Sequence, residues 1–215
     1  MEINETNLCY NNRFWVILAN SKTSRFHQVL KQARLLTETD LKRIIERFAH
    51  QFTEPFDTFN SLAVVGMQTR GVYIGKRVCN VIRDHYKVDV PFGVLDVTFY
   101  RDDFRTKMKM PEVRITDIPF NPDGKDIVLV DDVFYTGRTL RSALEALMSF
   151  GRPASIRFCC LIDRGHRELP LSADFVGRYV PTHISEEVQV KLSEIDGEDA
   201  VYVIHLNDKS TTKHG

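Results

Sequence analysis

Several common sequence signals are missing from this 215-residue chain. No apolar run approaches the length of ~20 residues that a membrane-spanning helix needs, so we expect no membrane partner. The four cysteines form no C-x-x-C pair, which argues against a zinc site and is typical of the reducing cytoplasm. Glu2 and Glu5 stand where a secretory signal would be basic, so we expect a cytoplasmic protein. Basic and acidic residues are balanced at 29 each, which gives no overall support for nucleic-acid binding.

Two phosphate-binding motifs of nucleotide enzymes are also missing. The pairs Gly75-Lys76 and Gly124-Lys125 are not followed by Ser or Thr, so neither completes the G-x-x-x-x-G-K-[ST] loop of an ATPase. The glycine-bearing loop at residues 66–71 lacks the pattern G-x-G-x-x-G, which argues against a dinucleotide cofactor.

What the chain does have is a 43% share of hydrophobic residues, enough for one domain with a substantial core. Apolar runs and amphipathic stretches alternate, predicting strands at 61–65, 91–100, 127–132 and 156–162 and helices at 41–52, 72–85 and 140–150. This alternation predicts an α/β fold with a mostly parallel central sheet and helices on both faces. Thr39 and Asp40 are expected to cap the first helix.

Three stretches do not fit the alternation. Residues 1–33 lack strong periodicity, and we expect an N-terminal extension of unknown role, either an appended element or an artefact of how the start was assigned. Residues 206–215 are polar and are expected to form a disordered tail, which leaves residues 34–205 as the folded domain. Residues 101–126 are charged, contain proline and are aperiodic, so we expect a flexible lid loop.

The most informative stretch follows the apolar run at residues 127–130 and reads Asp131-Asp132-Val133-Phe134-Tyr135-Thr136-Gly137-Arg138-Thr139. It places two carboxylates at the carboxyl end of a parallel strand, where open α/β sheets bind ligands. The Thr-Gly-Arg-Thr that follows opens a helix, whose N–H groups and dipole favour a phosphate. Carboxylates accept hydrogen bonds from sugar hydroxyls or hold a divalent cation. The stretch therefore predicts a pocket for a phosphorylated sugar.

This stretch resembles the 5-phosphoribosyl-1-diphosphate (PRPP) signature of the type I phosphoribosyltransferases. The similarity extends through residues 34–204, and the stretches 65–71, 95–103, 162–170 and 181–190 resemble the branch of bifunctional pyrimidine-operon regulators and uracil phosphoribosyltransferases. The resemblance implies the fold of that family, with a small hood, a flexible lid loop and a homo-oligomer of two or more chains. It also implies transfer of a phosphoribosyl group from PRPP to uracil, which yields UMP and pyrophosphate.

The resemblance also implies roles for individual residues. The acid pair would hold the ribose hydroxyls, residues 136–139 would anchor the 5-phosphate, Thr69 and Arg70 would contact pyrophosphate, and the lid would bring in Arg101. Mg²⁺ would be held mainly by substrate oxygens and water, so we expect no dedicated protein ligands. The expected catalytic residues are Asp131, Asp132, Arg70 and Arg101. Substrate contacts are expected from these four and from Thr69, Val133, Phe134, Tyr135, Thr136, Gly137, Arg138, Thr139, Arg164 and Val188, of which the last two would recognise the base.

The same branch binds messenger RNA in the presence of UMP and thereby attenuates transcription. The positions that look like its RNA face are Arg47, His50, Arg167 and Arg178. Glu46 stands where a neutral hydroxyl is typical and Ser172 where a basic residue is typical, and both changes weaken attraction to RNA phosphates. Three functions stay open: a uracil phosphoribosyltransferase with or without regulation by leader mRNA, an RNA-binding attenuator with little catalysis, and a phosphoribosyltransferase for hypoxanthine, guanine or orotate.

Overall fold

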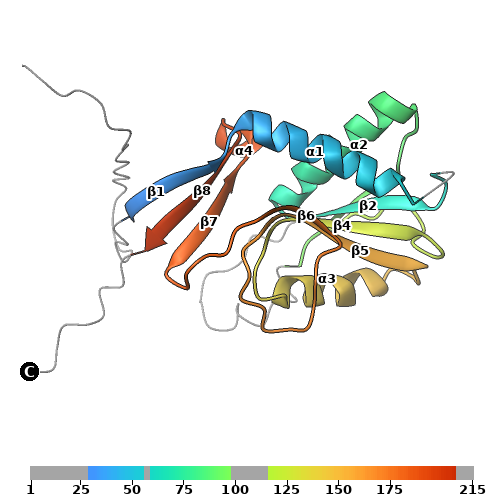
Figure 1. The fold of residues 1–215 in the computed structure, drawn as a ribbon. Coiled ribbons are helices and arrows are strands. Elements are labelled where there is room, and N and C mark those ends of the chain that lie inside the picture. The colour runs from blue at the N-terminus through green and yellow to red at the C-terminus, as the bar shows by residue number, and fades with distance from the viewer. Residues whose placement is uncertain (1–28, 56–58, 98–115, 207–215) are drawn as a thin grey trace, which may run out of the picture.

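The computed structural model describes residues 29–55, 59–97 and 116–206. Within these ranges a five-stranded parallel sheet, of order β3-β2-β4-β5-β6, lies beside a three-stranded antiparallel sheet, of order β1-β8-β7 (Figure 1). The strands are β1 (Val29–Leu36), β2 (Leu62–Met67), β3 (Phe92–Leu95), β4 (Asp126–Phe134), β5 (Ser155–Asp163), β6 (Phe175–Tyr179), β7 (Glu186–Lys191) and β8 (Ala200–Leu206). The helices are α1 (Glu38–Thr53), α2 (Arg70–Tyr86), α3 (Arg138–Met148) and α4 (Ser193–Asp196).

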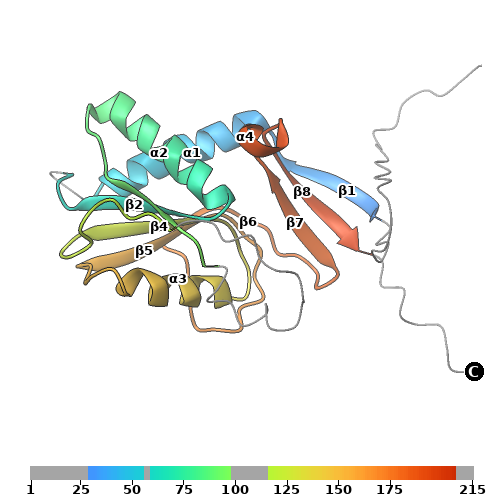
Figure 2. The same cartoon turned by 180° about the vertical axis from the view of Figure 1, so that it is seen from behind.

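Helices cover both faces of the parallel sheet, as the alternation predicted. Figure 2 shows α1 and α2 on one face and α3 on the other. Along β4, Val128 and Val130 pack into the core under α1 and α2, whereas Ile127 and Leu129 pack into the core against α3. Because successive side chains of a strand point to opposite faces, this one buried run supplies both hydrophobic cores. The α/β fold class is confirmed.

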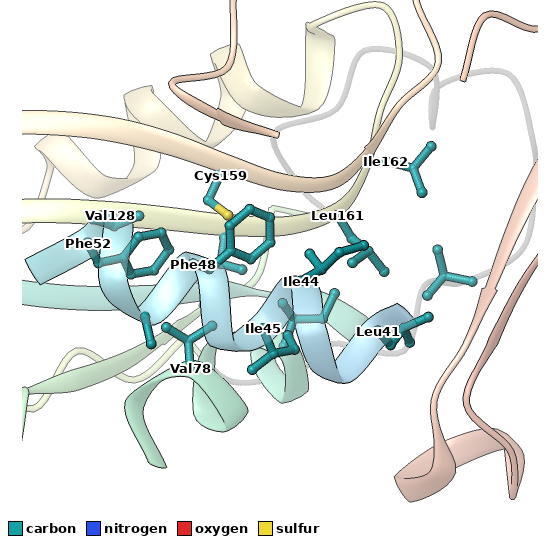
Figure 3. Packing of buried hydrophobic residues seen from close by; sticks show 14 of the residues in the cluster. Leu41, Ile44, Ile45, Phe48, Phe52, Val78, Val128, Cys159, Leu161 and Ile162 are labelled. Carbon is teal, nitrogen blue, oxygen red and sulfur yellow. The ribbon is translucent and has the colours of Figure 1, made fainter. Parts of the chain in front are cut away.

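Helix α1 buries its apolar face between α2 and the sheet (Figure 3). The rings of Phe48 and Phe52 are fully buried and stack with centroids 6.0 Å apart, and such burial contributes about 1.5–3 kcal/mol for each ring. The expected cap at Thr39-Asp40 is wrong by two residues. The N-cap is Thr37, because its backbone N–H donates to the Asp40 carboxylate at 2.9 Å while its hydroxyl accepts from the Asp40 N–H at 3.3 Å.

Several elements extend beyond their expected ends. Strand β1 begins at Val29, inside the expected N-terminal extension, because it pairs antiparallel with β8. Strand β4 continues to Phe134, since its residues beyond 132 still pair with β5. Helix α2 begins at Arg70, so the expected loop at residues 66–71 shrinks to two residues between β2 and α2. Of the expected lid at 101–126, residues 101–115 lie outside the described residues.

The antiparallel sheet and α4 form the hood that the resemblance implied, and two arginines of α2 tie it to the parallel sheet. Arg77 donates from Nε to Glu194 at 2.9 Å and from Nη1 to Asp199 at 2.7 Å. Arg70 donates from Nη2 to both carboxylate oxygens of Asp196, at 3.0 and 3.1 Å. The hood is therefore held against the amino-terminal half of α2. Within the ranges that the structure covers, none of the helices has the length and apolar character needed to cross a bilayer.

Candidate functional site

A cavity of about 740 Å³ opens where the carboxyl end of β4, the start of α3 and the hood strand β7 meet. Its lining residues are Gln68, Arg70, Val97, Asp131, Asp132, Val133, Phe134, Tyr135, Thr136, Gly137, Arg138, Thr139, Leu140, Arg164, Glu168, Glu187, Val188, Gln189 and Val190. The structure thus brings together the expected acid pair, phosphate loop and base-site residues. Thr69 lies between two residues of the wall, and Arg101 lies outside the described residues.

The acid pair lies near the carboxyl end of β4, where the strand is still paired with β5. Asp131 accepts a hydrogen bond from the backbone N–H of Asp132 at 2.9 Å, and Asp132 accepts one from the N–H of Val133 at 2.9 Å. Burial raises the pKa of Asp132, while its hydrogen bond with Asp131 and the charge of Arg70 oppose that shift. The two carboxyl groups are therefore fixed in place and electrostatically linked to the arginine across the cavity.

The loop between β4 and α3 leads into a helix start that faces the cavity. Gly137 is the N-cap of α3 and has φ 91°, a left-handed conformation that favours glycine. Gly137 has no side chain that could cap the helix, and the hydroxyl of Thr136 accepts a hydrogen bond from the N–H of Arg138 at 3.4 Å. The first N–H groups of a helix have no intrahelical partner and carry the positive end of the dipole, so this turn is suited to bind an anion.

The short loop between β2 and α2 places Arg70 on the opposite wall of the cavity. The peptide bond between Gln68 and Thr69 is cis. The Nε of Arg70 is buried and has no hydrogen-bond partner among the described residues, although Nη2 is paired with Asp196. The hood thus holds this guanidinium through Nη2.

Gly71 lies where α2 begins against β4. A Cβ at Gly71 would lie 2.2 Å from the carbonyl oxygen of Val130. The missing side chain lets α2 pack directly on the backbone of β4. This close approach sets the separation between Arg70 and the acid pair.

The end of the cavity beside the hood is built around Arg164, which is 7% exposed. Its Nη2 donates to the carbonyl of Glu186 at 2.6 Å, and its guanidinium lies 4.2 Å from the ring centroid of Tyr135. It therefore connects the phosphate loop to the start of β7. Val188 forms part of the wall, but its side chain is buried in the core with those of α1.

Sequence reasoning missed the residues on either side of Val188. Glu187 and Gln189 also line the cavity and are exposed, because neighbouring side chains of a strand point to opposite faces. The alternation of polar and apolar residues in β7 was the signal that could have identified them. Glu168 lines the cavity as well and forms an ion pair with Arg138 at 2.6 Å.

The residues expected to face RNA divide into two groups. Arg47 donates to the carbonyl of Gly177 at 2.6 Å, directly before Arg178, and His50 follows one turn later on α1. These three side chains are exposed along α1 and β6. Arg167 lies elsewhere, because it pairs with Asp163 behind the phosphate loop.

Potential metal ligands are sparse in this structure. Among residues 29–55, 59–97 and 116–206, no cluster of three His, Cys, Asp or Glu side chains is arranged to hold a metal ion. Asp131 and Asp132 line the cavity, and their carboxylate oxygens are hard ligands of the kind that Mg²⁺ prefers when a substrate supplies its other ligands.

Comparison with known proteins agrees with this geometry. The family model of the phosphoribosyl transferase domain matches residues 31–195. A "Bifunctional protein PyrR" of Thermus thermophilus is 50% identical over 79% of this chain and 94% of its own length. A protein of the same name from Pelotomaculum thermopropionicum is 48% identical over 81% of this chain and 96% of its own length.

Solved structures with the same fold are more distant. A hypoxanthine-guanine phosphoribosyltransferase of Bacillus anthracis superposes with a TM-score of 0.62 at 21% identity, covering 80% of this chain and 97% of its own. A hypoxanthine phosphoribosyltransferase of Staphylococcus aureus gives a TM-score of 0.59 at 23% identity, covering 82% and 93%. These structures establish the shared fold. Together with the matches in sequence, they show that the chain belongs to the phosphoribosyl transferase domain family and, within it, to the bifunctional PyrR proteins.

Proposed function

We propose that the protein transfers the phosphoribosyl group of PRPP to uracil, which yields UMP and pyrophosphate. The observation that carries this proposal is the acid pair Asp131-Asp132 beside the start of α3 in one cavity. The cavity offers acceptors for ribose hydroxyls next to donors for a phosphate. Relatives at 48–50% identity that bear the name of a bifunctional protein support the same reading.

The reaction is a displacement at the anomeric carbon of the ribose. The N1 atom of uracil forms the new C–N bond, the C–O bond to pyrophosphate breaks, and the N1 proton passes to solvent. Positive charge develops on the ribose ring, where Asp131 and Asp132 provide negative charge, and negative charge develops on the leaving group, where Arg70 provides donors. No nucleophilic side chain is needed, because uracil itself is the nucleophile.

A magnesium ion fits this chemistry. PRPP and pyrophosphate carry most of the oxygens that would bind Mg²⁺, and the Asp131 and Asp132 carboxylates are the protein groups that could hold it or its water shell. When bound, the ion neutralises charge on the diphosphate. We expect Arg164 and the adjacent edge of β7 to recognise the base, since a site with fixed polar groups rejects bases that leave those groups unpaired.

Initial rates of pyrophosphate release test the proposal. The protein is incubated with PRPP, Mg²⁺ and, separately, uracil, hypoxanthine, guanine or orotate, and Arg141→Gln serves as a control on the exposed side of α3. Turnover that depends on uracil supports the proposal. Turnover with a purine or orotate instead would assign another base, and no turnover with any of the four would contradict transferase activity.

We also propose that the exposed surface of α1 and β6 binds the leader mRNA of a pyrimidine operon when UMP is present. Arg47 and Arg178 support this second function, because both are exposed: Arg47 donates to the carbonyl of Gly177, and Arg178, the next residue of β6, donates to the carbonyl of Leu35. Glu46 and Glu54 line the groove beside Arg47, so we expect a modest affinity that falls steeply with salt.

Gel retardation with such an RNA, with and without UMP, tests the second function. Arg47→Gln is expected to weaken binding in all sequences tested, and Arg141→Gln, which lies on the opposite face of the sheet, is expected to leave it unchanged. Absence of a shift under both conditions would contradict RNA binding and leave the transferase proposal intact.

A further inference from the structure

The segment after β5 donates hydrogen bonds to three consecutive carbonyl groups, those of residues 134–136, where β4 leads into the phosphate loop. The carbonyl of Phe134 accepts from the N–H of Arg164 at 3.1 Å. The carbonyl of Tyr135 accepts from Nη1 of Arg167. The carbonyl of Thr136 accepts from the N–H groups of residues 168 and 169, at 3.0 and 3.2 Å. We call residues 163–169 the brace.

By binding these carbonyl groups, the brace also determines the direction of the N–H group in each of the three peptide units. A trans peptide is planar, so its C=O and the following N–H point in opposite directions. The peptide bonds here are trans, since the one cis bond among the described residues joins Gln68 and Thr69. With three carbonyls turned toward the brace, the N–H groups of Tyr135, Thr136 and Gly137 turn away from it. All three of these residues line the cavity.

Only the middle carbonyl depends on a side chain. The outer two are held by backbone donors, whereas that of Tyr135 is held by the Arg167 guanidinium. This guanidinium is itself fixed in several ways. It pairs with Asp163, donates to the carbonyl of Gly165 at 3.2 Å and lies 3.3 Å from the ring centroid of Phe134. Its side chain is 22% exposed.

We propose that Arg167 is a positioning residue for the 5-phosphate site. By holding the Tyr135 carbonyl, it aims the next N–H, that of Thr136, into the cavity before any ligand arrives. This inference rests on the proposed function for the identity of the ligand.

The 5-phosphate is shared by PRPP and UMP and is absent from uracil and pyrophosphate, which supplies a selective test. Wild type, Arg167→Gln, Arg167→Lys and the control Arg141→Gln are compared by initial rates and by calorimetric titration with UMP. For Arg167→Gln, we expect about a tenfold rise in the KM for PRPP and about a tenfold weaker UMP affinity, the value of one phosphate hydrogen bond. The KM for uracil is expected to change little. Arg167→Lys keeps a charge beside Asp163 and is expected to recover part of the loss.

The outcomes distinguish a positioning role of Arg167 from a general effect on the fold. An Arg167→Gln protein with wild-type KM for PRPP and wild-type UMP affinity would overturn it, as would equal losses for uracil and PRPP, which indicate general loosening of the fold. If Arg167→Gln does not fold, the same comparison is made with Arg167→Lys alone. The UMP titration needs no turnover, so an inactive wild type that binds UMP would contradict the proposed reaction and still test the brace.

Discussion

Replacing Gly71 by alanine tests how the packing of α2 on β4 sets the catalytic geometry. The new Cβ would lie 2.2 Å from the carbonyl oxygen of Val130, whereas an ordinary contact begins at 3.4 Å, so the helix start must retreat by about 1.2 Å. Both atoms belong to backbone segments, and neither can rotate away as a side chain can. Overpacking of this kind costs about 1–3 kcal/mol of folding free energy. A displacement near 1 Å between Arg70 and the acid pair lowers the rate by up to about a hundredfold.

The assay combines urea denaturation with initial rates of uracil-dependent pyrophosphate release. Gly75→Ala is the matched control, since it lies in the same helix and its new Cβ meets the ring of Phe92, at 2.9 Å, which is a side chain that can shift. We expect the Gly71→Ala protein to be less stable and much less active than the Gly75→Ala protein. Equal stability and equal rates for the two variants would refute the reasoning.

Three further predictions concern single side chains. Asp132→Asn is expected to lower kcat by orders of magnitude. Burial raises the pKa of Asp132, so the folded protein keeps the proton on this carboxyl group at pH values where the unfolded chain has lost it. The wild-type protein therefore loses stability as the pH rises from about 4 through the folded-state pKa. Asp132→Asn should flatten that decline in urea titrations at a series of pH values, and an unchanged slope would contradict it. Thr37→Ala removes the cap of α1 and should cost about 1 kcal/mol in urea denaturation, whereas a value near zero would mean that the cap is not needed. Arg77→Gln removes one of the two arginine contacts that hold the hood against α2 and should raise the KM for uracil more than that for PRPP. Equal effects would show that the hood does not cover the base.

The sequence predicted the parallel layer because its strands are short buried runs and its helices have regular apolar spacing. It did not predict the start of β1 at Val29, since an edge strand of the hood has no strong pattern of its own and forms only by pairing with β8, far along the chain. The ends of β4 were also missed. The predicted strand ended at Asp132, whereas pairing with β5 continues through Val133 to Phe134.

At the site, local motifs predicted the phosphate loop, the acid pair and Arg70. The contacts that hold these residues in place come from segments far away in the sequence, and no local sequence pattern predicts such contacts. Asp196 lies behind Arg70, and the brace lies behind the carbonyls of residues 134–136. The contacts of Arg167 were not predicted for the same reason, because they depend on how β5 ends beside β4. The close packing at Gly71 likewise depends on the neighbouring strand.

The most direct test of the account is a crystal structure of the protein with UMP. We predict that the 5-phosphate lies against the N–H groups of residues 136–139, with the ribose hydroxyls at Asp131 and Asp132 and the base against β7. A nucleotide bound with its phosphate away from this loop, or bound elsewhere on the protein, would contradict the account.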